Sequence, residues 1–432
     1  SFAIKAWPVS RLVTRLQPAG KSFTVAERYL STDNSFLIKR NRNRRVWLEA
    51  TAENLPPGTY SSLVTVSSAK SILKIPIHLK VLNWALPAVD FPVGPFNSTI
   101  QESWWFAGEN NFREEKLLQQ SFKMMNSVGL TTASFNAKFE VNWDKKPLII
   151  KGLDRVNHLM NLAKQNHFKS LVAYNAVFSN QDLCFGSFSN ADLELWVEAL
   201  KQQSKLKQWL PLQIIVCDEP VGSEDLKKAV SRVETLQKFS DDHLQFGAAF
   251  SFNSQHQESK ELYSKSQLPF LNLFDMDKLK SDQKNWIYYN AADRSSFGFG
   301  LFRLRQQTAL QARIAWNWNQ NAGNPYFALD AREDDINWCN SLKDGQLQCS
   351  VFLKRHILEG LNDYRLALLL KTLKSEKAKI IVKDIELHAS ISKDPIPGDF
   401  DNKYQQEEAW RNQILSLLES MSDEMSVKAK SK

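Results

Sequence analysis

Apolar and polar positions change their spacing twice along the chain, and the changes divide it into three parts. Up to about residue 88 they alternate in short runs, at 45–51, 61–66 and 72–81. The turn sequence Leu-Pro-Pro-Gly-Thr-Tyr at 55–60 separates the first two runs. Alternation with a period of two, interrupted by Pro and Gly, is typical of antiparallel strands. We therefore predict a β-sandwich over 1–88, and we expect its first strands to have been trimmed away because the segment is short.

From residue 89 to about residue 350, short apolar runs alternate with stretches in which apolar residues recur every three to four positions. The helical spacing is clearest at 112–128, 153–166, 190–203 and in the segment after residue 222. The predicted strands are 91–100, 130–136, 169–178, 212–217, 243–252, 269–274, 286–290 and 313–318. Alternating strands and helices of this number predict an α/β fold, the (β/α)8 TIM barrel.

Beyond residue 350 the spacing becomes mainly helical. Residues 352–374 place Leu353, Ile357, Leu361 and Tyr364 on one helical stripe. We predict one or two strands within 376–391, a last helix over 407–421 and a disordered tail over 428–432. The third part, 351–432, is therefore predicted to be a mainly helical C-terminal region.

One predicted strand ends in chemistry-bearing residues. The segment 212–220 reads LQIIVCDEP, so a buried apolar run leads directly into Asp218 and Glu219. TIM barrels carry their catalytic residues at the C-terminal ends of such strands. Adjacent carboxylates repel each other, so we expect at least one raised pKa, as a general acid requires. We interpret Glu219 as the best candidate for a catalytic acid. The alternative is that the two carboxylates have a structural role, either at the N-terminus of the next helix or in a salt bridge of the loop.

Aromatic and amide side chains follow several other predicted strands. Trp316 and Trp318 are two residues apart, so they share one face of a strand and would wall a sugar subsite, unless they pack in the core. For the tyrosines that end the 286–290 strand, packing at the rim is an equal alternative to a reacting-group contact. The further candidate substrate contacts are Tyr288, Tyr289, Asn290, Asn136, Asn175 and, on a loop, Tyr326.

Composition narrows the class of ligand. The chain has 13 Trp and 26 Phe, an excess that fits either carbohydrate binding or a large aromatic core. The net charge is +8, but Lys and Arg are spread along the chain, with one dense cluster at 39–45. We interpret that cluster as a solvated hairpin end, and we expect no nucleic-acid partner. The sequence contains no run of eighteen apolar residues, so it predicts no membrane span.

Cysteine and histidine patterns give no sign of a metal or cofactor. The four cysteines form no CxxC, and the seven histidines form neither HxH nor HExxH. The acidic segment 329–335 lacks EF-hand spacing, so we interpret it as a salt-bridged loop. Cys217 is interpreted as a small apolar residue of its strand, and pairing of Cys339 with Cys349 is left open. Because the chain starts at Ser1 without an initiator Met, we expect a processed protein that is secreted or periplasmic.

Several short motifs occur in a familiar order: LPPGTY, NWALP, the DEP of residues 218–220, AWNWN, GNPY and GLNDYRLALLL. In this the chain resembles glycoside hydrolase family 123 and its broad group of relatives, from about Val46 to Leu373. The most specific parts are the DEP step and GLNDYR at 360–365. The resemblance implies a TIM barrel with a β-sandwich that acts on β-linked N-acetylgalactosamine.

The resemblance also implies roles for the two carboxylates. Glu219 would protonate the glycosidic oxygen and later deprotonate water. Asp218 would orient the 2-acetamido group of the substrate, whose carbonyl oxygen attacks the anomeric carbon. The alternatives are a glycosidase for another galactose-type or sulfated polysaccharide, which the basic net charge would suit, and a carbohydrate-binding protein without catalytic activity.

Overall fold

The computed structural model describes residues 4–15, 23–30, 46–50, 55–95, 112–142, 149–178, 181–250, 257–272, 282, 284–289, 293–315, 339–341, 347–351, 353–391 and 404–430. The side chains of some strand residues, and of the last turns of the C-terminal helix, lie outside this description.

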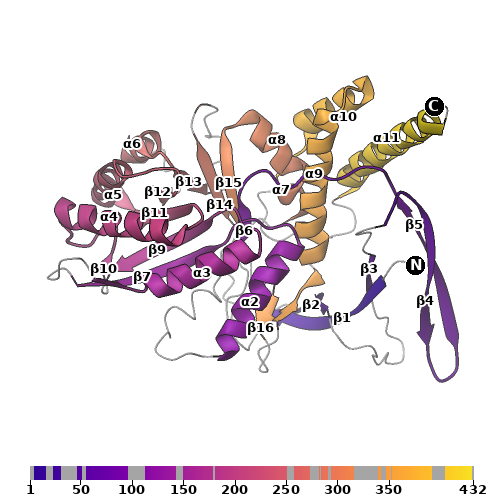
Figure 1. The fold of residues 1–432 in the computed structure, drawn as a ribbon, viewed down its shortest axis with the longest axis horizontal. Coiled ribbons are helices and arrows are strands. Elements are labelled where there is room, and N and C mark those ends of the chain that lie inside the picture. The colour runs from indigo at the N-terminus through magenta and orange to yellow at the C-terminus, as the bar shows by residue number, and fades with distance from the viewer. Residues whose placement is uncertain are drawn as a thin grey trace.

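The N-terminal part consists of antiparallel strands, as its alternating pattern predicts. β1 (Ile4–Arg15) lies between β2 (Phe23–Leu30) and β3 (Val46–Ala50) in one sheet. β4 (Gly58–Ser67) and β5 (Ile72–Val81) form a separate two-stranded ribbon, which extends along the edge of the molecule (Figure 1). Packing of the two sheets face to face as a sandwich stays a prediction.

The central part is a curled parallel sheet with helices, similar to a TIM barrel. Its neighbouring strands run in the order β6-β15-β14-β13-β12-β11-β9-β7. Their bounds are β6 (Val93–Pro95), β7 (Ser134–Asn142), β9 (Leu171–Phe178), β11 (Leu212–Asp218), β12 (Leu244–Phe250), β13 (Pro269–Asn272), β14 (Asn285–Tyr289) and β15 (Leu310–Ala315). Each strand predicted between residues 89 and 350 overlaps one of them.

The two ends of this series also meet. The backbone N–H groups of Thr131 and Thr132, which lead into β7, donate to the carbonyl oxygen of Val93 in β6 at 2.8 and 3.2 Å. Gly94 permits this approach, because a Cβ there would lie 1.8 Å from the carbonyl oxygen of Thr132. Two short strands, β8 (Ile149–Lys151) and β10 (Gln181–Asp182), add to the sheet in antiparallel pairs.

Helices cover the outer face of the sheet (Figure 1). They are α2 (Phe112–Ser127), α3 (Leu153–Gln165), α4 (Asn190–Lys207), α5 (Gly222–Gln237), α6 (Gln257–Lys265), α7 (Arg294–Phe297) and α8 (Phe299–Gln307). The stripes that the spacing predicts are buried, for example Leu193, Trp196, Val197 and Leu200 of α4. α5 begins at Gly222, and the hydroxyl of Ser223 in its first turn donates to Glu258 of α6 at 2.6 Å.

Alternation along the parallel strands separates two apolar clusters. One fills the space between the sheet and the helices. The other lies on the inner face and consists of Val172, Tyr174, Ile215, Ala249, Leu268, Phe270, Trp286, Tyr288 and Ala312. Side chains two residues apart share a face, so Ile215 marks the inner face of β11.

Beyond residue 353, the described C-terminal part consists of helices and short connections. A π-helical turn, η2 (Leu353–Leu358), leads into α9 (Glu359–Thr372), followed by α10 (Glu376–His388) and α11 (Gln405–Lys430). The strands predicted within 376–391 are wrong, because Ala378, Val382 and Ile385 are buried at helical spacing in α10. The tail prediction is also wrong as far as Lys430, where α11 ends.

The GLNDYR segment joins this helical part to the chain that enters the barrel. Asp363 is fully buried and pairs with Arg294 at 2.6 Å and with Arg411 at 2.7 Å. The Tyr364 hydroxyl donates to Asp90 at 2.7 Å, and Arg365 donates to the carbonyl oxygen of Pro87 at 2.6 Å. The segment therefore fixes the linker that leads from the N-terminal strands into β6.

A small antiparallel pair precedes η2. β16 (Cys339–Ser341) pairs with β17 (Leu347–Cys349), and Cys339 faces Cys349 in the register. The two cysteines form a disulfide bond, which settles the pairing that the sequence leaves open.

Candidate active site

The carboxylates at the end of β11 owe their direction to a β-bulge. Pairing with β12 steps from Ile215–Gly247 to Cys217–Ala248, so Val216 is an extra residue without a partner. Strict alternation from Ile215 would point Asp218 to the outer face. The bulge takes Val216 out of the alternation, so that Cys217 follows Ile215 in the register and Asp218 lies on the inner face.

Glu219 reaches the same face through its backbone conformation. Its backbone φ is +42°, in the left-handed region that residues other than Gly seldom adopt. The conformation costs about 1–2 kcal/mol, and a hydrogen bond of 2.8 Å from the Glu219 N–H to the carbonyl oxygen of Ala249 helps to hold it. Strained backbone of this kind is often kept at functional sites.

Two buried tyrosines hold the carboxylates. The Tyr174 hydroxyl of β9 donates to Asp218 at 2.5 Å, and the Tyr288 hydroxyl of β14 donates to Glu219 at 2.5 Å. The tyrosines belong to the inner cluster and are 3% and 6% exposed, whereas Asp218 and Glu219 are exposed residues. The pair therefore lies where the buried interior of the barrel meets solvent.

The tyrosines are fixed as proton donors. Burial raises the pKa of Tyr174 well above its usual value, and the neighbouring carboxylate of Asp218 adds to the effect. Burial raises the pKa of Tyr288 in the same way, with Glu219 as the second cause. Both hydroxyls consequently stay protonated at neutral pH, and each offers its hydrogen to a carboxylate oxygen.

Asn272 completes this arrangement and was missed from the sequence. It is the last residue of β13, lies opposite Tyr288 in the register and is 8% exposed. Its side chain hydrogen-bonds the Tyr288 hydroxyl, whose own hydrogen goes to Glu219. The sequence analysis also leaves out Tyr174. Asn272 and Tyr174 are polar residues near the C-terminal ends of strands, and the same position is the reason for proposing Asn136 and Asn175.

Cys217, which directly precedes the carboxylates, is not the lone apolar residue that the sequence suggested. It forms a disulfide bond with Cys184, from the segment that follows β10. Both cysteines are almost fully buried, which is equally typical of an unpaired apolar cysteine. A separation of 33 residues gave no local signal of pairing. The bond ties a neighbouring segment to the end of β11.

The other predicted contacts are only partly placed. Tyr288 lies beside Glu219, and its contact with substrate stays a prediction. The backbone of Asn136 lies in β7 opposite Tyr174, that of Asn175 in β9, and that of Tyr289 at the end of β14, whereas their side chains lie outside the described part. Four further predicted contacts lie outside the described residues altogether: Trp316, Trp318, Asn290 and Tyr326.

Within the described ranges, no three His, Cys, Asp or Glu side chains gather closely enough to hold a metal ion. Across the same part of the chain, no helix is both long and apolar enough to cross a lipid bilayer.

A large cavity, of about 850 Å³, lies at the opposite end of the barrel, among the residues that begin the strands. Cavity size would favour that end as the reaction site. We place the candidate chemistry at Asp218 and Glu219 instead, because paired carboxylates, strained backbone and oriented donors meet there.

Comparisons with known proteins give a fold and no family. No protein-family model matches the chain, and no curated protein matches it. Among solved structures, a family 123 glycoside hydrolase from Clostridium perfringens aligns with a TM-score of 0.72 at 13% identity, over 99% of this chain and 87% of that chain. A glycoside hydrolase family 5 lichenase from Caldicellulosiruptor aligns at a TM-score of 0.38 and 12% identity, over 66% of this chain and 98% of that one.

Proposed function

We propose that this protein is a glycoside hydrolase that uses Glu219 as its acid and base. The observation that carries the proposal is the pair of adjacent carboxylates, turned to one face by a bulge and a left-handed residue and each held by a buried tyrosine. The likeness of fold to a family 123 glycoside hydrolase supports it. For the same reason we propose a complete (β/α)8 barrel, supported by the Val93 hydrogen bonds that join its first and second strands.

We further propose that the substrate is a β-linked N-acetylgalactosamine or a related sugar, and that the substrate assists its own cleavage. Most retaining and inverting enzymes place two carboxylates on opposite sides of the scissile bond. Asp218 and Glu219 are consecutive residues at one strand end, so they share one side. A carbonyl oxygen of the substrate's 2-acetamido group then supplies the nucleophile, so that the reaction requires no second carboxylate on the opposite side.

The side chains have separate tasks in this reaction. Glu219 gives its proton to the glycosidic oxygen as the acetamido oxygen attacks the anomeric carbon. It then takes a proton from the water that opens the cyclic intermediate. Asp218, fixed by Tyr174, accepts the acetamido N–H and stabilises the positive charge that develops on that group. Tyr288, supported by Asn272, stabilises the carboxylate that Glu219 becomes after it has given up its proton.

Hydrolysis of a chromogenic β-N-acetylgalactosaminide tests the assignment. Glu219→Gln should reduce kcat by at least about a hundredfold, because proton transfer contributes about 10²–10⁴-fold. Glu224→Gln, an exposed carboxylate in the first turn of α5, is the matched control and should retain activity. Unchanged turnover in Glu219→Gln would exclude it as the acid. Binding of glycans without turnover across a broad panel would favour the carbohydrate-binding alternative, and turnover of sulfated or other galactose-type glycans alone would favour the other glycosidase.

We also propose a secreted or periplasmic location. Disulfide bonds persist mainly in oxidising compartments, and the Cys184–Cys217 and Cys339–Cys349 bonds support such a location. Alkylation of free thiols in the protein as isolated from its source would test it, since four reactive cysteines after denaturation would contradict the proposal.

A further inference from the structure

The large cavity at the other end of the barrel has the features of a binding site of its own. It lies among residues that precede or begin the parallel strands, such as Pro211 before β11, Leu268 before β13 and Lys284 before β14. Asp218 lies at the far end of β11, so the cavity is separate from the candidate active site. Its volume of about 850 Å³ falls within the range of about 300–1,000 Å³ that is usual for small-molecule sites.

A buried acceptor without a partner lies in the floor of this cavity. Gln213, on the inner face of β11, is only 4% exposed. Its Nε2 donates to Oε1 of Gln245 at 3.3 Å, but its own Oε1 has no hydrogen-bond partner. A buried polar atom without a partner costs about 1–3 kcal/mol. A ligand that donates a hydrogen bond to this oxygen would remove that cost.

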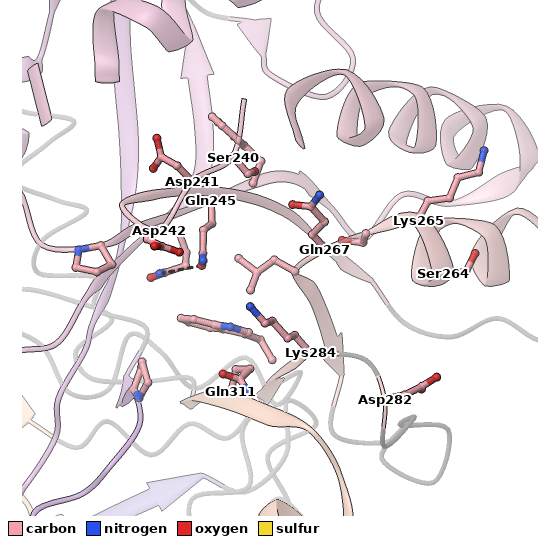
Figure 2. Close-up of a pocket in the computed structure, with 17 residues that line it drawn as sticks. Ser240, Asp241, Asp242, Gln245, Ser264, Lys265, Gln267, Asp282, Lys284 and Gln311 are labelled. Carbon is pink, nitrogen blue, oxygen red and sulfur yellow. Dashed lines mark hydrogen bonds between the residues drawn. The ribbon is translucent and has the colours of Figure 1, made fainter. Parts of the chain in front are cut away.

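The groups around the acceptor suit hydroxyl groups. Figure 2 shows Gln245, Gln267, Lys284 and Gln311 around the centre of the cavity, while Lys265 and Asp282 point away from it. A glutamine amide both donates and accepts hydrogen bonds, as a hydroxyl group does. Trp286 and Leu268 of the inner cluster supply apolar surface between the amides, which suits the C–H faces of a sugar ring.

The charges of the lining argue against an ionic ligand. Asp241 accepts from the backbone N–H groups of His243 and Leu244 and pairs with Lys201 at 3.3 Å. Lys265 pairs with Glu234 and Glu261. Among the described residues of the lining, the other charged groups are Asp242, Asp282 and Lys284, which are exposed and of mixed sign. These described charges therefore do not add up to a field of one sign that would attract a phosphate or a cation.

We propose that this cavity is a second binding site, for a neutral polyhydroxylated ligand of one or two sugar rings. Gln213 accepts from a ligand hydroxyl, Gln245 and Lys284 donate to neighbouring oxygens, and the apolar floor contacts the ring. The site lies outside the proposed catalytic centre, so its ligand is not the group being cleaved there.

Isothermal titration calorimetry on the full chain tests the proposal, with galactose, N-acetylgalactosamine and inorganic phosphate as separate probes. We expect saturable binding of a neutral sugar at about millimolar concentration. Gln213→Leu should weaken it about tenfold, the effect of one lost hydrogen bond to a buried acceptor. Lys284→Met, at the exposed rim, should fold normally and weaken binding about threefold. Glu219→Ala, at the other end of the barrel, should leave this binding unchanged.

Three results would overturn the proposal. The first is the absence of saturable heat with either sugar. The second is sugar binding that Glu219→Ala abolishes and both cavity variants retain, which would place the sugar at the catalytic end. The third is tighter binding of phosphate than of either sugar, which would show an anion site. Circular dichroism of each variant confirms its fold, and a loss of fold in Gln213→Leu leaves Lys284→Met to decide.

Discussion

The Tyr288 hydroxyl offers a sharp test of how Glu219 works, through the variant Tyr288→Phe. The phenylalanine ring keeps the packing of the inner cluster and removes only the donor that lies 2.5 Å from Glu219. In the proposed reaction Glu219 carries its proton before the transfer, so the bond then joins two neutral groups and is worth about 1 kcal/mol. After proton transfer it joins a hydroxyl to a carboxylate, worth about 1.5–3 kcal/mol.

Only the difference between these two states affects the rate, because catalysis depends on interactions that strengthen toward the transition state. A difference of about 1–1.5 kcal/mol predicts a loss of about tenfold in kcat, with little change in KM. The loss should be larger for substrates with poor leaving groups, which depend most on the proton from Glu219. It should be smaller for a nitrophenyl glycoside, whose leaving group departs with little protonation.

Steady-state kinetics on a series of aryl and alkyl β-N-acetylgalactosaminides provides the assay. Tyr263→Phe is the matched control, because its hydroxyl is also buried and donates to Asn285 at 2.8 Å, away from the carboxylates. An equal loss of kcat for every leaving group, or a change confined to KM, would refute the reasoning. So would the same effect in Tyr263→Phe.

Three further predictions concern stability. Asp363→Ala should destabilise the fold by about 1.5–3 kcal/mol in urea unfolding, because Arg294 and Arg411 lose the buried carboxylate that they share and keep only their more exposed partners, Glu408 and Glu359. A loss below about 1 kcal/mol would contradict a structural role for GLNDYR. Removing the Cys184–Cys217 bond by paired Cys→Ala changes should cost about 3–4 kcal/mol for a separation of 33 residues, and unchanged unfolding of the double variant would contradict it. Burial raises the pKa of Tyr174 and Tyr288 in the folded state, so their contribution to stability is complete below about pH 10 and is lost as pH rises beyond it. Urea unfolding between about pH 8 and 11 should therefore show a smaller alkaline loss in Tyr174→Phe than in the wild type, and equal slopes would argue against the shift.

The strands of the barrel were predictable because buried parallel strands are continuous apolar runs. LQIIVC at 212–217 is such a run, and its polar end marked the candidate site. The helix α10 was mistaken for strands, because Ile380, Ile381 and Val382 are adjacent residues of high β propensity. In the structure Ile380 is 68% exposed, and only the helical spacing of the buried residues decides the element.

The partners of the carboxylates depend on pairing between strands that are distant in sequence. Tyr174 is 44 residues from Asp218, and Tyr288 is 69 residues from Glu219. The sequence points to Tyr288 because it lies near the end of a predicted strand, whereas Tyr174 lies inside one and Asn272 belongs to the predicted strand 269–274. The Val216 bulge was also beyond the sequence, since a bulge is defined by the register with a neighbouring strand.

Val216 shifts the alternation of β11 by one residue. Before it, an odd-numbered residue such as Ile215 faces the barrel interior, and after it the even-numbered Asp218 does. Deleting Val216 would remove the bulge and leave Ile215, Cys217 and Asp218 in regular alternation, each on its present face. Straightening the bulge with Val216 kept would instead turn Cys217 inward and Asp218 toward the helices. The disulfide and the candidate carboxylate would then exchange environments. The pairing with β12 that sets Val216 aside is therefore as necessary to the site as the acids are.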